Sequence, residues 1–228
     1  MIRYPGLSKN LIIMKRSFNS LMEQYRILIW NAEDPAIKTM IEPFGYNSAK
    51  IEEGKTLFNE VEALAETQRK EYAEQYTVST EFIEKQEEAR NNLNTLRKFA
   101  KFIFKNNNEA FNTLNLGSKL PLGFSDWLQA ARYFYERLQE HPEWTTDLAP
   151  FGVNNDISVS NLQLLAELKR LQEKRQRETG DAQQATQLRN EKHEELKAWY
   201  GNLRNLVKIL FEDADAQYLE KLGILVRS

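Results

Sequence analysis

Hydrophobic residues recur every three or four positions along most of this chain, which is the spacing of amphipathic helices. The first such stretch covers residues 17–31, and the corresponding later one follows Ser125 and Asp126, which we expect to cap it. Both stretches end before a proline, Pro35 or Pro142, because proline disfavours helical geometry in the preceding residue. A short second segment follows each of them. The pattern predicts an all-α protein, a helical bundle.

The chain also matches itself when it is shifted by 107 positions. The longest shared motif is Pro-Phe-Gly, at Pro43, Phe44 and Gly45 and again at Pro150, Phe151 and Gly152. The offset stays constant over about eighty positions, and it is longer than the roughly 20–50 residues of solenoid repeats. We therefore predict a tandem duplication with pseudo-two-fold symmetry. The expected segments are an N-terminal extension (1–14), repeat 1 (15–117), a connector (118–123), repeat 2 (124–223) and a tail (224–228), with both repeats packed as one domain.

Each repeat contains one long stretch whose middle is polar, at residues 66–70 and 172–178. Such a stretch is either a helical hairpin with its tip at the polar patch, or one helix of more than fifty residues, roughly 80 Å long. The candidate tips, residues 77–80 and Gly180-Asp181, do not correspond at the 107-residue offset, which counts against the hairpin. Globular helices longer than about 25 residues normally need a sustained heptad seam, and here the seam lapses. We favour the hairpin.

The Pro-Phe-Gly motif has a structural interpretation. Gly45 and Gly152 can adopt the left-handed conformation that ends a helix, and Phe44 and Phe151 would then cover the ends of neighbouring helices. A second apolar feature is the run at residues 99–104, which is hydrophobic nearly all round and which we expect to be buried on several sides.

Composition excludes several classes of function. The 228 residues carry a formal charge of −2, so no overall field draws the protein to nucleic acid. The absence of cysteine excludes disulfides, thiolate metal sites and thiol catalysis. No apolar run approaches the roughly twenty residues that span a bilayer, so we expect a soluble, cytoplasmic protein and not an integral membrane protein.

Catalytic motifs are missing from the sequence. A di-iron carboxylate site needs Glu-x-x-His, but Leu138 precedes His141 by three residues and Asn190 precedes His193 by three. We expect His141 to end a helix and His193 to lie on a solvated helix face. There is no nucleophile elbow and no phosphate-binding glycine loop. The sequence therefore predicts no catalytic residue, no metal and no cofactor, and gives no support for an enzyme.

One basic pattern is a candidate for binding. Arg97, Lys101 and Lys105 form a stripe beside aromatic residues, and Arg204 and Lys208 repeat part of it. The structural explanation is that basic residues near a helix C-terminus stabilise the helix dipole. We expect a non-catalytic scaffold or protein-interaction module, acting on an unknown protein partner or by self-association. The alternative is a peripheral binder of acidic membrane or nucleic acid through these basic faces.

Overall fold

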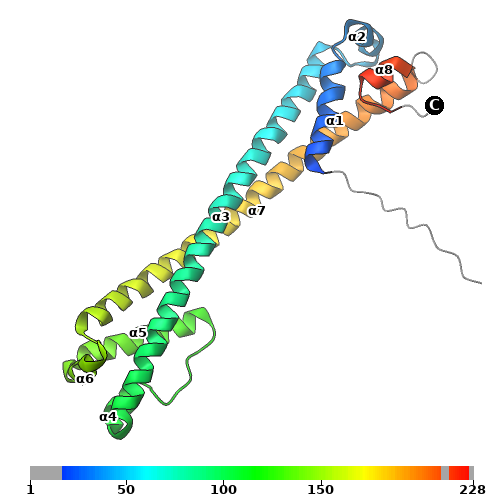
Figure 1. Cartoon of the computed structure of the whole chain (residues 1–228). Coiled ribbons are helices and arrows are strands. Elements are labelled where there is room, and N and C mark those ends of the chain that lie inside the picture. Colours follow the sequence, from blue (N-terminus) through cyan, green and yellow to red (C-terminus); the bar gives the residue numbers. More distant parts are fainter. Residues whose placement is uncertain (1–16, 212–215, 226–228) are drawn as a thin grey trace, which may run out of the picture. The chain divides into compact units, whose positions relative to one another are not determined.

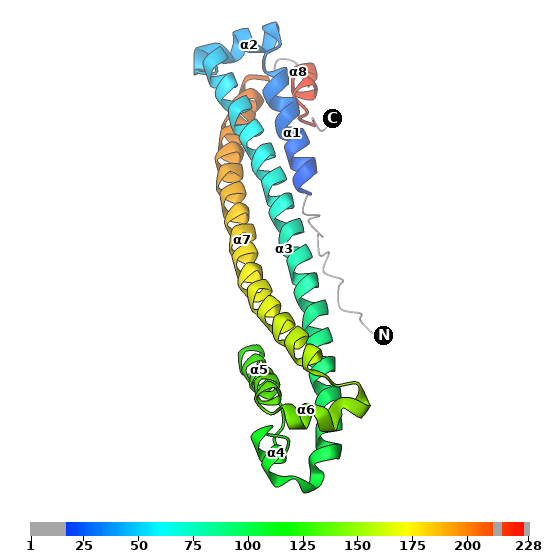
Figure 2. The same cartoon turned by 90° about the vertical axis from the view of Figure 1, so that its left-hand side faces the viewer.

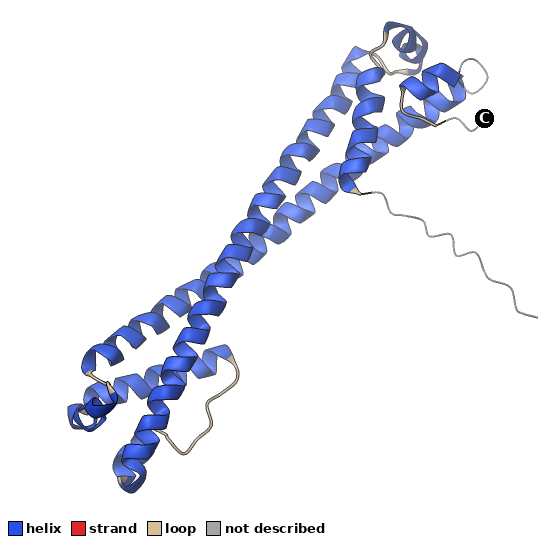
Figure 3. Ribbon diagram, viewed as in Figure 1, coloured by secondary structure: helices blue, strands red, loops and turns tan. Residues whose placement is uncertain are grey.

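The computed structural model describes residues 17–211 and 216–225. Within these residues every regular element is a helix and there is no strand, which confirms the all-α prediction for this part of the chain (Figure 3). The expected N-terminal extension, residues 1–14, lies outside the described residues, as do residues 226–228 of the tail. Among the helices of residues 17–211 and 216–225, none is long and apolar enough to cross a bilayer.

Two long helices dominate the order of elements, and short helices precede and follow each of them (Figure 1). The first series is α1 (Phe18–Asn31), α2 (Pro35–Ile41), the 3₁₀ turn η1 (Glu42–Phe44), α3 (Ser48–Ile103), the 3₁₀ turn η2 (Phe104–Asn106) and α4 (Asn108–Thr113). The second series is α5 (Phe124–Glu140), α6 (Pro142–Leu148), the 3₁₀ turn η3 (Ala149–Phe151), α7 (Asn155–Phe211) and α8 (Ala216–Lys221).

Both long stretches are single helices, so the hairpin prediction is wrong. α3 runs for 56 residues and α7 for 57, and neither breaks at its polar middle (Figure 1). Two hydroxyl groups at the candidate tip bond within the helix: Thr80 Oγ1 donates to the carbonyl of Tyr76, and Thr77 Oγ1 to that of Ala73. Gly180 is accommodated inside α7 without a turn.

The polar middles do not need an apolar seam because polar groups of α3 and α7 meet there. Gln68 Nε2 donates to Thr186 Oγ1 at 2.9 Å, and Gln75 Nε2 donates to Thr179 Oγ1 at 3.3 Å. The sequence between Gly54 and Gly117 also contains no helix-breaking residue. Satisfied polar contacts and good helix formers therefore extend the helices where a hydrophobic stripe lapses.

The chain divides into two compact units. Unit 1 comprises residues 1–68 and 185–228, and unit 2 comprises residues 69–184. Each unit therefore takes residues from both halves of the sequence, because the first part of α3 and the last part of α7 belong to unit 1 and their remaining parts to unit 2.

Unit 1 packs α1, α2 and α8 around the antiparallel segments of α3 and α7 (Figure 2). Ser17 Oγ accepts from the backbone N–H of Ser20, so Ser17 caps α1. The centre of the core is fully buried. Its innermost side chains are Leu28, Ile29, Ile37, Ile41, Val61, Leu196, Leu203, Val207 and Phe211. Each such side chain contributes about 1.5–3 kcal/mol of burial energy.

Unit 2 packs α4, α5 and α6 around the other segments of the two long helices. Its fully buried residues include more aromatic side chains than those of unit 1. They are Leu93, Ala100, Phe104, Leu114, Trp127, Phe134, Tyr135, Leu138, Leu148 and Leu168. α5 begins at Phe124 after Gly123, without a side-chain cap, so the capping role predicted for Ser125 and Asp126 is wrong. Both residues lie in the first turn of the helix instead.

Candidate functional site

The predicted basic stripe of unit 2 is divided between the interior and the surface. Arg97 is only 7% exposed, and its Nη2 donates to the backbone carbonyls of Asn115 and Ser118 at 3.0 and 2.9 Å. Burial lowers the pKa of Arg97 from its ordinary value. Lys101 near the end of α3 and Lys105 in the following turn η2 are exposed. Arg97 therefore holds the connector, and only the two lysines belong to an open surface.

The matching residues of the second series lie in the other unit. Arg204 and Lys208 are partly exposed near the end of α7, in unit 1. Lys101 and Lys105 belong to unit 2.

The Pro-Phe-Gly turns have the backbone that the sequence predicts. Gly45 and Gly152, each following its proline and phenylalanine, have φ angles of 91° and 76°, in the left-handed region where a side chain would be strained. The phenylalanines differ. Phe151 lies 5.1 Å from Phe99 and 6.3 Å from Phe102 between ring centroids, whereas Phe44 is 57% exposed. Pro43 and Pro150 each lie in the 3₁₀ turn before the glycine.

The run at residues 99–104 is not buried on all sides. Phe104 is 1% exposed, but Phe102 is 64% exposed and has Lys105 Nζ 5.9 Å from its ring centroid. Further back on α3, Tyr76 and Ile83 are 74% and 57% exposed. A hydrophobic periodicity marks the residues that can be buried, but it does not show whether another element covers them.

An open depression lies next to Arg97 in unit 2, with a volume of about 440 Å³. Residues from the connector and α5 line it, among them Ser118, Lys119, Gln129 and Tyr133. Sequence reasoning missed it because residues 114–121 fold back on α3, a long-range arrangement that no local pattern encodes.

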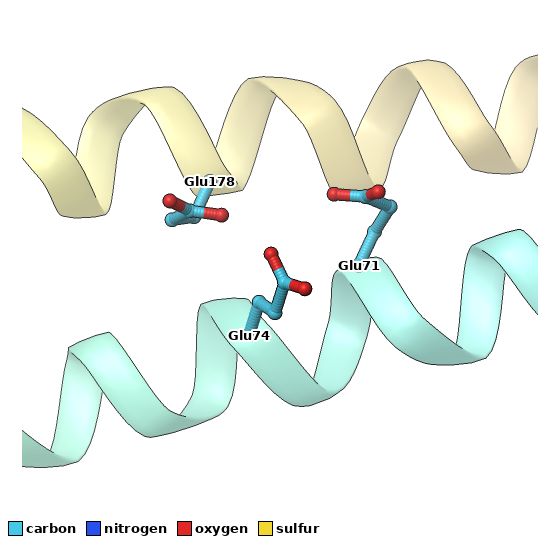
Figure 4. Close-up of side chains that lie close together, drawn as sticks. All are labelled: Glu71, Glu74 and Glu178. Atoms are coloured by element: carbon cyan, nitrogen blue, oxygen red, sulfur yellow. The ribbon is translucent and has the colours of Figure 1, made fainter.

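Three carboxylates of unit 2 also lie close together (Figure 4). Glu71 and Glu74 of α3 and Glu178 of α7 bring one oxygen each within 4.8 Å of the others. Lys70 Nζ lies 3.7 Å from Glu74 Oε1, and Glu74 is exposed. Acidic side chains of this kind are common on solvated helix faces, so the geometry alone does not define a metal site.

The two histidines pack against aromatic rings. His141 lies between α5 and α6, as predicted, and stacks on Trp144 with ring centroids 3.7 Å apart. His193 does not lie on a solvated face, because Phe18 and Tyr25 of α1 pack against it at 5.5 and 5.8 Å. Burial lowers the pKa of His193. The charged residues around His193, at positions 191–195, gave no sign of this contact in the sequence. α1 covers one side of this otherwise polar segment.

Comparison with known proteins found no family model, no curated protein and no solved structure that matches the chain. The function is therefore argued from the surfaces and contacts above.

Proposed function

We propose that this protein is a non-catalytic helical interaction module, built from two copies of one unit, that associates with a second copy of itself. Repeat 1 and repeat 2 supply the copies, and an exposed face of α3 supplies the contact. Burial alone raises the pKa of Tyr135, with no charged partner, which supports a structural role for this group.

Equivalent contacts in the two units support the duplication. In unit 1, Lys192 Nζ lies 3.3 Å from Glu60 Oε2, and in unit 2, Lys85 Nζ lies 3.6 Å from Glu167 Oε2. Lys85 and Lys192 are 107 positions apart, and so are Glu60 and Glu167. Each ion pair thus joins a residue from one repeat to a residue from the other. A duplication would produce these matching ion pairs if each unit combined a segment of the long helix of repeat 1 with a segment of the long helix of repeat 2.

A second equivalent pair has changed its chemistry. Gly54 faces the indole of Trp199 in unit 1. The positions 107 residues away are Asn161 and Asn92, and in unit 2 the Asn92 side chain donates to Asn161 Oδ1 at 3.0 Å. The equivalent contact between α3 and α7 is made by glycine and tryptophan in unit 1 and by two hydrogen-bonded asparagines in unit 2. Such paired substitution is the expected divergence of a duplicated interface.

One exposed face of α3 carries the proposed contact, and we call it the α3 face. Its residues fall within about 100° of one another around the helix. They are Tyr76, Ile83, Glu84, Glu87, Asn91, Asn94, Lys98, Lys101, Phe102 and Lys105, and all are exposed. The acidic residues lie in its first half and the basic residues in its second half. Apolar side chains lie in both halves.

This order of charges is self-complementary, and it is the observation that carries the proposal. An antiparallel pair of α3 faces related by a two-fold axis near residues 91–94 would place each acidic residue opposite a lysine of the second copy. The register pairs Glu84 with Lys101, Glu87 with Lys98 and Ile83 with Phe102. Two-fold symmetry forms each contact twice. Exposed ion pairs contribute only about 0.2–1 kcal/mol each, so we expect a weak, salt-sensitive dimer.

Charge reversal tests this interface in the full-length protein. We expect E84K/E87K and K98E/K101E each to lose self-association in sedimentation velocity, because each places like charges opposite one another at the paired positions 84/101 and 87/98 of the α3 face. An equimolar mixture of the two variants should associate again, as should the fourfold variant, whose pattern is inverted. E62K/E191K changes two exposed charges of unit 1 and serves as the matched control.

Two results would contradict the proposal. One is a wild-type protein that stays monomeric at low salt and high concentration. The other is a set of variants that associate as the wild type does. Binding of the wild type to vesicles of anionic lipid, lost in K98E/K101E, would instead support the alternative of a peripheral membrane binder, for which exposed Lys101 and Lys105 beside Phe102 are the supporting observation.

A further inference from the structure

Arg97 is a buried cation whose charge no acidic side chain balances. It forms no ion pair with the carboxylates of the described residues, and its hydrogen bonds to the protein are the two that Nη2 donates to the carbonyls of Asn115 and Ser118. Carbonyl groups satisfy donors but do not neutralise a charge. A buried charge without a counterion is costly, which makes this guanidinium a strong site for an anion.

Arg97 also helps to line the 440 Å³ depression. Its Nε and Nη1 donate to no residue that the structure describes. A guanidinium offers donors in a fixed fork that fits the two oxygens of a carboxylate or phosphate. The volume lies within the range of about 300–1,000 Å³ that is typical of small-molecule sites.

The rest of the lining matches an organic anion. Lys119 is exposed on the connector and forms no ion pair with the described residues, so it offers a second positive charge. Leu120 and Pro121 supply apolar surface, and Tyr133 of α5 supplies an aromatic ring that is 42% exposed. Asp126 is the acidic residue of the lining and lies in the first turn of α5.

We propose that the connector and α5 form a binding site for a small organic anion, in which Arg97 and Lys119 hold a carboxylate or phosphate group. The apolar body of the ligand packs on Leu120 and Tyr133. This site does not depend on the α3 face, so either proposal can fail without the other. Because the carbonyls of Asn115 and Ser118 bind the same guanidinium, the ligand also fastens residues 115–118 to α3.

Calorimetric titration of the full chain with three probes tests the site. Benzoate and phenyl phosphate carry the two anionic groups on the same ring, and benzyl alcohol is the neutral control. We expect one or both anions to bind at least tenfold more tightly than benzyl alcohol. The stronger anion identifies whether the site takes a carboxylate or a phosphate.

Variants locate the binding. Lys119→Gln changes an exposed residue and keeps the fold, and we expect it to weaken the anion about two- to fivefold, the effect of one exposed charge pair. Arg97→Gln should weaken it by roughly tenfold or more, since a charged hydrogen-bond partner is lost. Arg204→Gln, the same position in repeat 2, should leave the affinity unchanged.

The proposal is overturned if neither anion binds at millimolar concentration, in which case Arg97 serves only to hold the connector. It is also overturned if benzyl alcohol binds as tightly as the anions, or if Lys119→Gln binds them as the wild type does. The Lys119 variant decides the question even if Arg97→Gln fails to fold.

Discussion

Replacing Gly54 by alanine tests a close contact between α3 and α7. Gly54 lies inside α3 and is buried against Trp199 of α7. A Cβ atom at this position would lie 2.5 Å from both Cη2 and Cζ2 of the indole, far inside the contact distance of two carbon atoms. The indole has little room to retreat, because it is 5% exposed and Tyr46 packs edge-on against it at 5.8 Å.

Two effects of opposite sign determine how much Gly54→Ala changes the free energy of unfolding. Alanine stabilises a helix interior by about 1 kcal/mol relative to glycine. Overpacking of a tight core costs about 1–3 kcal/mol, and we place Gly54→Ala near the upper end because the contact is with a ring and not with a flexible chain. The expected net loss is about 1–2 kcal/mol of unfolding free energy, or roughly 2–8 °C in Tm for a chain of this size.

Thermal and urea unfolding followed by circular dichroism measure this change. Gly201→Ala and Gly180→Ala are matched controls on α7, since nothing lies within 4 Å of a Cβ at either position. Both should raise stability by about 0.5–1 kcal/mol. The double variant Gly54→Ala/Trp199→Leu should lose less unfolding free energy than the two single variants lose together. If Gly54→Ala proved as stable as Gly201→Ala, the proposed packing of Trp199 on α3 would be refuted.

Three further predictions follow from single positions. Gly45→Ala should lose about 1 kcal/mol in urea unfolding, because the φ of 91° is strained for any residue with a Cβ, and equal stability would contradict this. Tyr135→Phe should be neutral or stabilising by the same assay, because the buried hydroxyl has no hydrogen-bond partner among the described residues, and a loss above about 1 kcal/mol would contradict this. His193 has a lowered pKa, so its contribution is present above the ordinary pKa of histidine and is lost as the pH falls through the folded-state pKa. Stability should therefore fall more steeply below about pH 6 in the wild type than in His193→Gln, and identical pH profiles would refute the role of this residue.

Local signals in the sequence predicted the short helices well. α1 lies within the predicted apolar stretch of residues 17–31, and α2 and α6 are the short second segments expected after it and after its later counterpart. The left-handed glycines were predictable too, because a glycine after Pro-Phe at the end of an apolar segment has few other uses. These features depend on residues within one or two helical turns.

Long-range contacts were not predictable in the same way. The polar middle of α3 suggested a hairpin tip, because the sequence does not show that Gln68 meets Thr186 on another helix. Arg97 was assigned to a surface stripe by its spacing, whereas the fold of the connector buries it. In both cases the partner lies far away along the chain, and only the tertiary structure shows whether a polar residue faces water or another polar group.

Cysteine cross-linking tests the continuous long helices most directly, and the chain has no cysteine of its own to interfere. We predict that a short bis-maleimide joins the introduced thiols within one molecule in E60C/K192C and in K85C/E167C, the two equivalent ion pairs between α3 and α7. K70C/E87C should not be joined, since these positions are about 25 Å apart on a continuous helix. A hairpin with its tip near residues 77–80 would give the opposite result. Efficient cross-linking of K70C/E87C, with none in the two α3–α7 pairs, would contradict the structure described here and the duplication argued from it.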